Sequence, residues 1–196
     1  MHDKNTSKKY TVELINCDGK IIFEREIYFE CEQLLTDEAI VKQLRQNKIY
    51  ILPSNTITVD EYKITIQGIF ILINQYIYEM KAKDTIYDLV ERQHDLDLEE
   101  HENDLISLLP CNCGGVCACS TCCVIIEDDN KIDTTDLLSA KTEYEEDILE
   151  EKCSNHKCSY HNIRLGCQIS FIEKWNGLKL STVKESKVPN TKIFTS

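Results

Sequence analysis

The sequence predicts a fold of the α+β class, because strand patterns and capped helix patterns both occur along it. Two runs rich in β-branched and aromatic residues, 10–16 and 21–29, flank the dipeptide Asp18-Gly19, which favours a two-residue hairpin turn. Farther along, Thr142 and Glu145 have the spacing of a capping box at the start of a helix. The chain has 196 residues, enough for one domain with a well-formed core.

Helix and strand patterns continue after the opening hairpin. Thr36 can cap a helix over 36–44, and a run rich in Ile, Tyr and Thr at 62–78 predicts one or two strands. Asp84 can cap a second helix. The apolar positions of these two helices have helical spacing and are Ile40, Val41, Leu44, Ile86, Leu89 and Val90.

The last third of the chain contains one more helix and three predicted strands. We expect a buried strand at 123–127 and further strands at 168–172 and 178–183, with Trp175 packing in the turn between the last two. The residues expected to turn the helix after Thr142 toward the core are Tyr144, Ile148 and Leu149.

Charge and cysteine content narrow the classes of function. The chain has 34 acidic and 22 basic residues and a formal net charge of −12, which disfavours nucleic acid and anionic membranes as partners and favours basic proteins. The longest apolar run, 69–73, is far too short to span a bilayer, so we expect a soluble chain. Eleven cysteines, an odd number, without a secretory leader pattern favour reduced, metal-binding thiols over a disulfide scaffold.

Three cysteines in one short loop and one remote cysteine form the most specific motif. Cys113, Cys119 and Cys122 have the spacing C-x5-C-x2-C, and Cys167 follows 45 residues later. Four cysteine thiolates are what a [2Fe–2S] cluster requires, so these four are the candidate ligands. Three further cysteines crowd the loop without producing a second trio of this spacing: Cys111, Cys117 and Cys123.

The residues between these cysteines suit a cluster-binding loop. Gly114 and Gly115 follow the first candidate ligand and allow the backbone to approach a ligand closely, with N–H groups that can point at an anion. Ser120 and Thr121 add hydroxyl donors. Hydrogen bonds to the sulfurs favour the more negative, reduced state and so help to set the potential.

The loop 113–122, together with Arg164-Leu165-Gly166-Cys167-Gln168-Ile169, resembles the adrenodoxin-type [2Fe–2S] ferredoxins, the family of mitochondrial and bacterial-assembly-type ferredoxins. The resemblance covers 10–30 and 78–183. It implies a β-grasp fold, an open mixed sheet packed on a helix, over 10–184. A short segment 1–9 would precede this domain, and a tail 185–196 would follow it.

Two segments exceed the family pattern, at 31–76 and at 99–109, and are predicted to be insertions. The first could extend the sheet or loop out. Because its Ile, Asn, Tyr and Lys bias is typical of AT-rich DNA, it could also be translated noncoding sequence. In each case we expect it to be peripheral to function.

The resemblance implies a one-electron carrier and not an enzyme. A [2Fe–2S] cluster on Cys113, Cys119, Cys122 and Cys167 would receive its electron from an NADPH-dependent ferredoxin reductase. The acceptor would be the iron–sulfur cluster assembly complex or, as the alternative, a cytochrome P450-type hydroxylase. The location implied is the mitochondrial matrix or a related organelle. It depends on the resemblance, since 1–9 is short and lacks the arginines of a transit peptide.

The helix after Thr142 is strongly acidic, and the family docks its partners on this helix. An alternative is a solvated face that complements the helix dipole. The residues predicted to dock partners are Glu143, Glu145, Glu146, Asp147, Glu150 and Glu151.

A hypothesis from another class is a zinc-binding interaction module without a redox role. Two cysteines and two histidines follow the acidic helix within nine residues and could bind zinc, although their spacing matches no common zinc finger. The alternative is that the two cysteines are a spare pair of surface thiols. They are Cys153, His156, Cys158 and His161.

Overall fold

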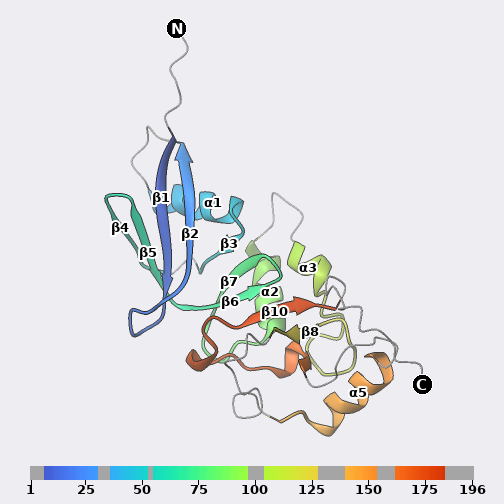
Figure 1. Cartoon of the computed structure of the whole chain (residues 1–196). Helices are drawn as coiled ribbons and strands as arrows, with labels where there is room; N and C mark the ends of the chain where they lie inside the picture. Colours follow the sequence, from blue (N-terminus) through green and yellow to red (C-terminus); the bar gives the residue numbers. More distant parts are fainter. Residues whose placement is uncertain are drawn as a thin grey trace, which may run out of the picture. The chain divides into compact units, whose positions relative to one another are not determined.

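The computed structural model describes residues 7–30, 36–52, 55–96, 104–127, 140–153 and 162–183 (Figure 1). The chain divides into two compact units. Unit 1 consists of Met1–Lys83 and Phe171–Lys179, and unit 2 of Asp84–Ser170 and Leu180–Ser196. Among the described helices, none is both long and apolar enough to cross a lipid bilayer. The predicted domain bounds, 10–184 with two insertions, stay a prediction.

Unit 1 opens with the predicted hairpin, in which β1 (Ser7–Ile15) pairs antiparallel with β2 (Ile21–Glu30). The turn is longer than the two residues predicted. The side-chain oxygen of Asn16 accepts hydrogen bonds from the N–H groups of Asp18 (3.1 Å) and Lys20 (2.8 Å), which closes the wider loop. Gly19 supplies the left-handed φ of +77° within it.

The segment 31–76 includes α1 (Asp37–Gln46), β3 (Ile49–Tyr50), β4 (Ile57–Asp60) and β5 (Lys63–Gln67), all in unit 1. Helix α1 begins as predicted, because the Thr36 hydroxyl accepts the N–H of Ala39 (3.3 Å). Strand β5 pairs in parallel with β1, and the order β2-β1-β5-β4 places both in the centre of the sheet.

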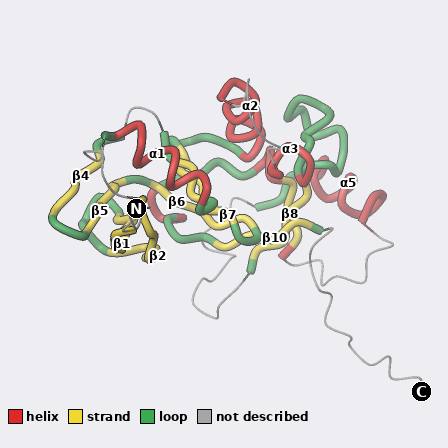
Figure 2. Tube along the Cα trace, turned by 90° about the horizontal axis from the view of Figure 1, so that it is seen from above, coloured by secondary structure: helices red, strands yellow, loops and turns green. Residues whose placement is uncertain are grey.

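Helix α1 packs on this sheet through two residues that were predicted to be apolar contacts. Ile40 and Leu44 are completely buried in the same core as Val12 and Ile66, and Figure 2 shows α1 on one side of β1, β2 and β5. A mixed sheet packed on a helix confirms the predicted α+β class and β-grasp arrangement. The looped-out interpretation of 31–76 is therefore wrong for its described residues, since these residues build the core, and the noncoding interpretation stays untested.

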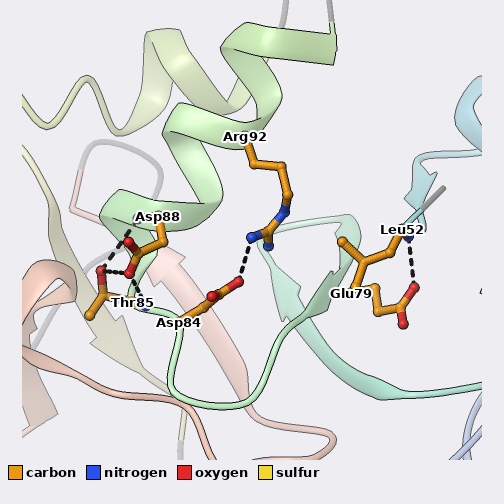
Figure 3. Close-up of polar contacts among 6 residues, drawn as sticks. All are labelled: Leu52, Glu79, Asp84, Thr85, Asp88 and Arg92. Atoms are coloured by element: carbon orange, nitrogen blue, oxygen red, sulfur yellow. Dashed lines mark hydrogen bonds and ion pairs between the residues drawn. The ribbon is translucent and has the colours of Figure 1, made fainter. Parts of the chain in front are cut away.

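Two more strands, β6 (Ile69–Ile73) and β7 (Tyr76–Met80), form an antiparallel hairpin, and β3 pairs in parallel with β7. The run 62–78 therefore enters three strands and not one or two, because Gly68 and Asn74 interrupt it; Asn74 has a φ of +53°. The buried Glu79 on β7 accepts the N–H of Leu52 at 2.7 Å (Figure 3).

The segment Phe171–Lys179 returns to unit 1. As predicted, Trp175 is buried, and its ring packs edge-on against Phe171 with 6.4 Å between centroids. Asn176 fixes the segment, because it accepts the N–H of Phe70 (2.9 Å) and donates to the carbonyl of Gly68 (2.7 Å). The Asn176 side chain thus bonds to the backbone of both Gly68 and Phe70 at the β5–β6 junction.

Unit 2 contains α2 (Ile86–Leu96), α3 (Asp104–Leu108) and α5 (Glu143–Cys153). It also contains an antiparallel arrangement in the order β10 (Lys179–Thr182), β8 (Cys123–Ile126) and β9 (Ile163–Leu165). Strands β8 and β10 confirm the predictions at 123–127 and 178–183. The predicted strand at 168–172 is wrong. A 3-10 turn, η2 (Gly166–Gln168), bends the chain there because Gly166 donates its N–H to the Cys122 carbonyl (2.9 Å).

The start of α2 differs from the prediction in its capping residue. The Thr85 hydroxyl accepts the N–H of Asp88 (3.3 Å), and the Asp88 carboxylate accepts the N–H of Thr85 (2.6 Å), so this pair forms the capping box (Figure 3). Asp84, the predicted cap, instead forms an ion pair with Arg92 two turns along the helix.

Candidate metal centre

The loop between α3 and β8 coils tightly. Gly114 and Gly115 have φ values of +66° and +79°, and two residues with side chains, Cys111 and Cys117, also have positive φ values of +48° and +56°. Each left-handed residue that carries a Cβ costs about 1 kcal/mol or more, so the surroundings must stabilise this conformation. Successive residues of this kind turn backbone N–H groups toward the inside of a loop.

The four candidate ligands come together as two pairs of thiols. The side chain of Cys113 is hydrogen-bonded to that of Cys119, and the side chain of Cys122 to those of Cys111 and Cys167. Cys122 and Cys167 are buried, whereas Cys113 and Cys119 are only half-buried. The structure therefore brings all four predicted residues into one region, with one pair deeper than the other.

Close packing at Gly166 brings Cys167 to the loop. A Cβ added to Gly166 would lie 2.7 Å from Cβ and Cγ1 of Ile86 and 3.0 Å from the Cys122 carbonyl oxygen. Because only glycine fits between α2 and the loop here, η2 can approach closely enough for Cys167 to reach Cys122.

Backbone N–H groups converge on the sulfurs of these cysteines. Cys113 accepts from the N–H groups of Ala118 and Gly115. Cys167 accepts from the N–H of Cys117, and Cys122 from that of Cys167. The left-handed residues thus place donors where they would stabilise negative charge on sulfur.

Two side chains add further donors. Gln168 donates from its amide nitrogen to the Cys167 sulfur at 3.3 Å. The Thr121 oxygen lies 3.1 Å from the Cys119 sulfur and accepts the N–H of Asn112 at 2.9 Å, which leaves its hydroxyl proton for the sulfur. The predicted role of Thr121 agrees with this geometry. Ser120 contributes its carbonyl, which accepts the N–H of Cys123 at 3.1 Å.

The acidities of the thiols reflect this environment. Burial alone would raise the pKa of Cys113, but the hydrogen bonds from Ala118, Cys119 and Gly115 lower that pKa below its ordinary value. Hydrogen bonding to the Cys111 side chain, followed by burial, raises the pKa of Cys122 to about 12. The pKa of Cys167 is also raised, first by Cys122 and then by burial. A second thiolate in the deeper pair is therefore unfavourable without a neighbouring cation.

The arrangement fits a two-iron cluster better than a single ion. Within the described stretches of the chain, no three His, Cys, Asp or Glu side chains converge as ligands of one metal ion. A structural zinc site needs four ligands around one point, whereas each iron of a [2Fe–2S] cluster takes two cysteines. The two thiol pairs match the second requirement. Of the other proposed zinc ligands, the side chain of Cys153 and all of His156, Cys158 and His161 lie outside what the structure describes.

Helix α5 presents five of its six predicted docking carboxylates to solvent: Glu143, Glu146, Asp147, Glu150 and Glu151. The sixth, Glu145, is completely buried and must be removed from the docking set. It forms a two-oxygen ion pair with Arg164, at 2.8 and 2.9 Å, and also accepts the N–H of Leu165 (2.8 Å). Thr142 caps the helix as predicted, since its hydroxyl accepts the N–H of Glu145 (3.2 Å).

The inner face of α5 also differs from the prediction. Leu149 is buried and Ile148 is half-buried, as expected, but Tyr144 is 77% exposed. Glu145 occupies the inward position in its place, because Arg164 neutralises its charge. Arg164, in the motif before Cys167, was the available sequence signal. An arginine that is buried at such a position requires an acidic partner.

Comparisons with known proteins give one similar sequence and several similar structures. The chain is 32% identical over 138 residues to the mitochondrial adrenodoxin homolog of Saccharomyces cerevisiae; the match covers 69% of this chain and 66% of that protein. No protein-family model matches the chain.

Among solved structures, reduced putidaredoxin from Pseudomonas putida, as a single-residue variant, is 19% identical with a TM-score of 0.40 and coverage of 58% of this chain and 92% of that one. An ISC-like [2Fe–2S] ferredoxin from Pseudomonas putida is 24% identical with a TM-score of 0.39, over 59% of this chain and 92% of that one.

Proposed function

Because the chain belongs to the adrenodoxin-type [2Fe–2S] ferredoxin family, we propose that it is a one-electron carrier. Cys113, Cys119, Cys122 and Cys167 would hold its cluster, the first two as one pair of ligands and the last two as the other. The observation that carries the proposal is the meeting of these two thiol pairs among convergent N–H donors. When bound, the cluster accepts and releases one electron.

The protein's own residues bind, shield and tune this centre. Donors to the four sulfurs are the side chains of Thr121 and Gln168 and the N–H groups of Gly115, Ala118, Cys117 and Cys167. These donors stabilise the more negative state and so raise the reduction potential. Since Cys113 and Cys119 are the more exposed pair, electrons enter and leave on their side of the loop.

The electron comes from an NADPH-dependent ferredoxin reductase, which docks on the acidic face of α5. Five exposed carboxylates on one helix favour a basic partner and a fast, salt-sensitive encounter. The acceptor is the iron–sulfur cluster assembly complex, in the mitochondrion or a related organelle. Support for this location comes from the family and from the mitochondrial name of the yeast relative.

Metal analysis of the purified full chain tests the proposal. Equal amounts of iron and acid-labile sulfide, about two of each per chain, with a red-brown colour and a rhombic paramagnetic signal after one-electron reduction, are expected. A colourless protein that retains zinc and gives no such signal would instead support the zinc-binding module. A second arm then adds the reductase and measures whether NADPH reduces the centre.

A further inference from the structure

Tyr87, on the first turn of α2, lies against the glycine turn of the cysteine loop. A Cβ added to Gly115 would lie 3.0 Å from both Cγ and Cδ1 of Tyr87, and one added to Gly114 would lie 4.0 Å from its hydroxyl oxygen. The phenol ring therefore lies over Gly115, and its hydroxyl lies near Gly114. The ring can lie this close only because Gly115 has no side chain.

The ring is held in place along its own helix. Its hydroxyl donates a hydrogen bond to the Glu91 carboxylate, one turn farther along α2. This bond, followed by burial, raises the pKa of Tyr87, so the phenol stays a neutral donor. The capping box of Thr85 and Asp88 fixes the backbone on either side of Tyr87. Both ends of the side chain are thus anchored.

The turn beneath the ring provides one of the donors to sulfur. Gly115 donates its N–H to Cys113, and Gly114 donates to the Cys111 carbonyl at 2.9 Å. Both glycines have left-handed φ values and can adopt many other backbone conformations. A turn of this kind would move easily if nothing lay against it, and the N–H of Gly115 would then leave the sulfur.

We propose that Tyr87 is a positioning residue for the cluster: its ring, tethered by Glu91, holds the Gly114–Gly115 turn so that the Gly115 N–H remains on the Cys113 sulfur. The inference rests on the proposed function, since it concerns the potential of the cluster bound there. The N–H to sulfur bond favours the reduced state, so loss of the ring lowers the reduction potential.

Hydrogen exchange and redox titration of the cluster-loaded chain test this role. In Tyr87→Leu, which keeps an apolar cover, the peptide containing Gly115 should exchange its amide hydrogens roughly tenfold faster, because a held donor is released. The reduction potential should become more negative. Tyr87→Phe keeps the ring without its tether and should fall between this variant and wild type. In Glu91→Gln an amide oxygen still accepts the phenol, so wild-type values are expected.

Tyr28→Leu, at an exposed position on β2, is the matched control and should change neither quantity. A Tyr87→Leu protein that loads its cluster with unchanged exchange and potential would overturn the inference and leave the electron-carrier function intact. If Tyr87→Leu does not fold, Tyr87→Phe decides, because unchanged exchange and potential there would contradict the tether. A wild-type chain without iron and sulfide would reject the proposed function itself.

Discussion

Glu145 holds Arg164 through both of its carboxylate oxygens, and the two side chains are only 0% and 3% exposed. The same carboxylate accepts the N–H of Leu165, two residues before Cys167. Helix α5, which carries the acidic face, is therefore bonded to β9, the strand directly before the turn that contains Cys167.

Arg164→Met should destabilise the protein by about 3–5 kcal/mol, because it leaves the Glu145 charge buried without its partner. Urea unfolding followed by circular dichroism measures the change in free energy. Replacing both partners, as Glu145→Leu with Arg164→Met, should restore part of the loss, since neither buried charge then remains.

The exposed pair of Lys9 and Glu26, whose nitrogen and oxygen lie 2.6 Å apart, is the matched control. Lys9→Met should cost at most about 1 kcal/mol, as exposed ion pairs do. If Arg164→Met costs no more than Lys9→Met, the buried pair does not stabilise the fold in the way its geometry indicates.

Local patterns predicted much of the fold, because their determinants lie close together in the sequence. Thr36 and Thr142 cap the helices that follow them, and the hairpin forms around Gly19. Glu145 was misassigned for a long-range reason, since a glutamate among five other acids looks solvent-exposed until Arg164 is placed against it. Glu145 is buried and Tyr144 is exposed, the opposite of what the apolar pattern suggested for these two positions.

The segment 31–76 was misjudged for a similar reason. Its excess over the family pattern suggested a peripheral insertion, but β5 pairs with β1, a strand more than 40 residues earlier, and no local pattern reveals that pairing. The cysteine spacing, in contrast, could be recognised from sequence because three of the four thiols lie in one loop. The support from Gln168 and Tyr87 depends on the fold and was missed.

Cys→Ser substitutions distinguish the four candidate ligands from the other cysteines of the loop. At Cys113, Cys119, Cys122 or Cys167 the change should strongly reduce the iron and sulfide content, or shift the absorption spectrum where serine binds iron. At Cys117 and Cys123 the cluster should remain. Cys111→Ser should also keep it, although its contact with Cys122 predicts a small spectral change. Loss of the cluster in Cys117→Ser with retention in Cys119→Ser would contradict the assignment.

Gly166→Ala should impair both folding and cluster loading. Its new methyl group would lie 2.7 Å from Ile86 and would push η2 away from Cys122, at a cost of about 1–3 kcal/mol. Gly19→Ala meets no atom within 4 Å and serves as the control; its φ of +77° costs about 1 kcal/mol in stability while the iron content stays normal. Equal iron content in both variants would argue against close packing at Gly166.

Deletion of 31–76, with a short linker in its place, should abolish the fold of unit 1. The deletion removes α1, β3, β4, β5 and β6, and it exposes Val12 and Leu14, which are buried in the same core. The sequence alone suggested that the chain would tolerate this change, and the structure reverses that expectation. Soluble yield and circular dichroism measure the outcome. A soluble, cooperatively unfolding deletion variant would show that the segment is dispensable after all.

The five exposed carboxylates of α5 should dock the reductase, and this prediction decides how the carrier recognises its partner. Side chains of like charge on one short helix repel one another and reduce its stability. A basic partner relieves this repulsion at each encounter and is attracted over a distance that salt limits to about 8 Å at physiological strength. Electron transfer from the reductase should therefore slow as salt rises above its optimum.

Asp147→Lys and Glu150→Lys, both exposed on α5, should slow reductase-driven reduction about tenfold at low salt, the equivalent of about 1.4 kcal/mol. The cluster spectrum and potential should remain those of wild type. Asp60→Lys on β4, an exposed acid in unit 1, makes the same change in net charge and should leave the rate nearly unchanged. Stopped-flow reduction across a salt series measures all four proteins.

If the three variants slow equally, net charge and not the face of α5 governs the encounter. If none of the variants slows and salt has no effect, the docking proposal is wrong. The carboxylates then form a solvated surface, and those at the start of the helix complement its dipole.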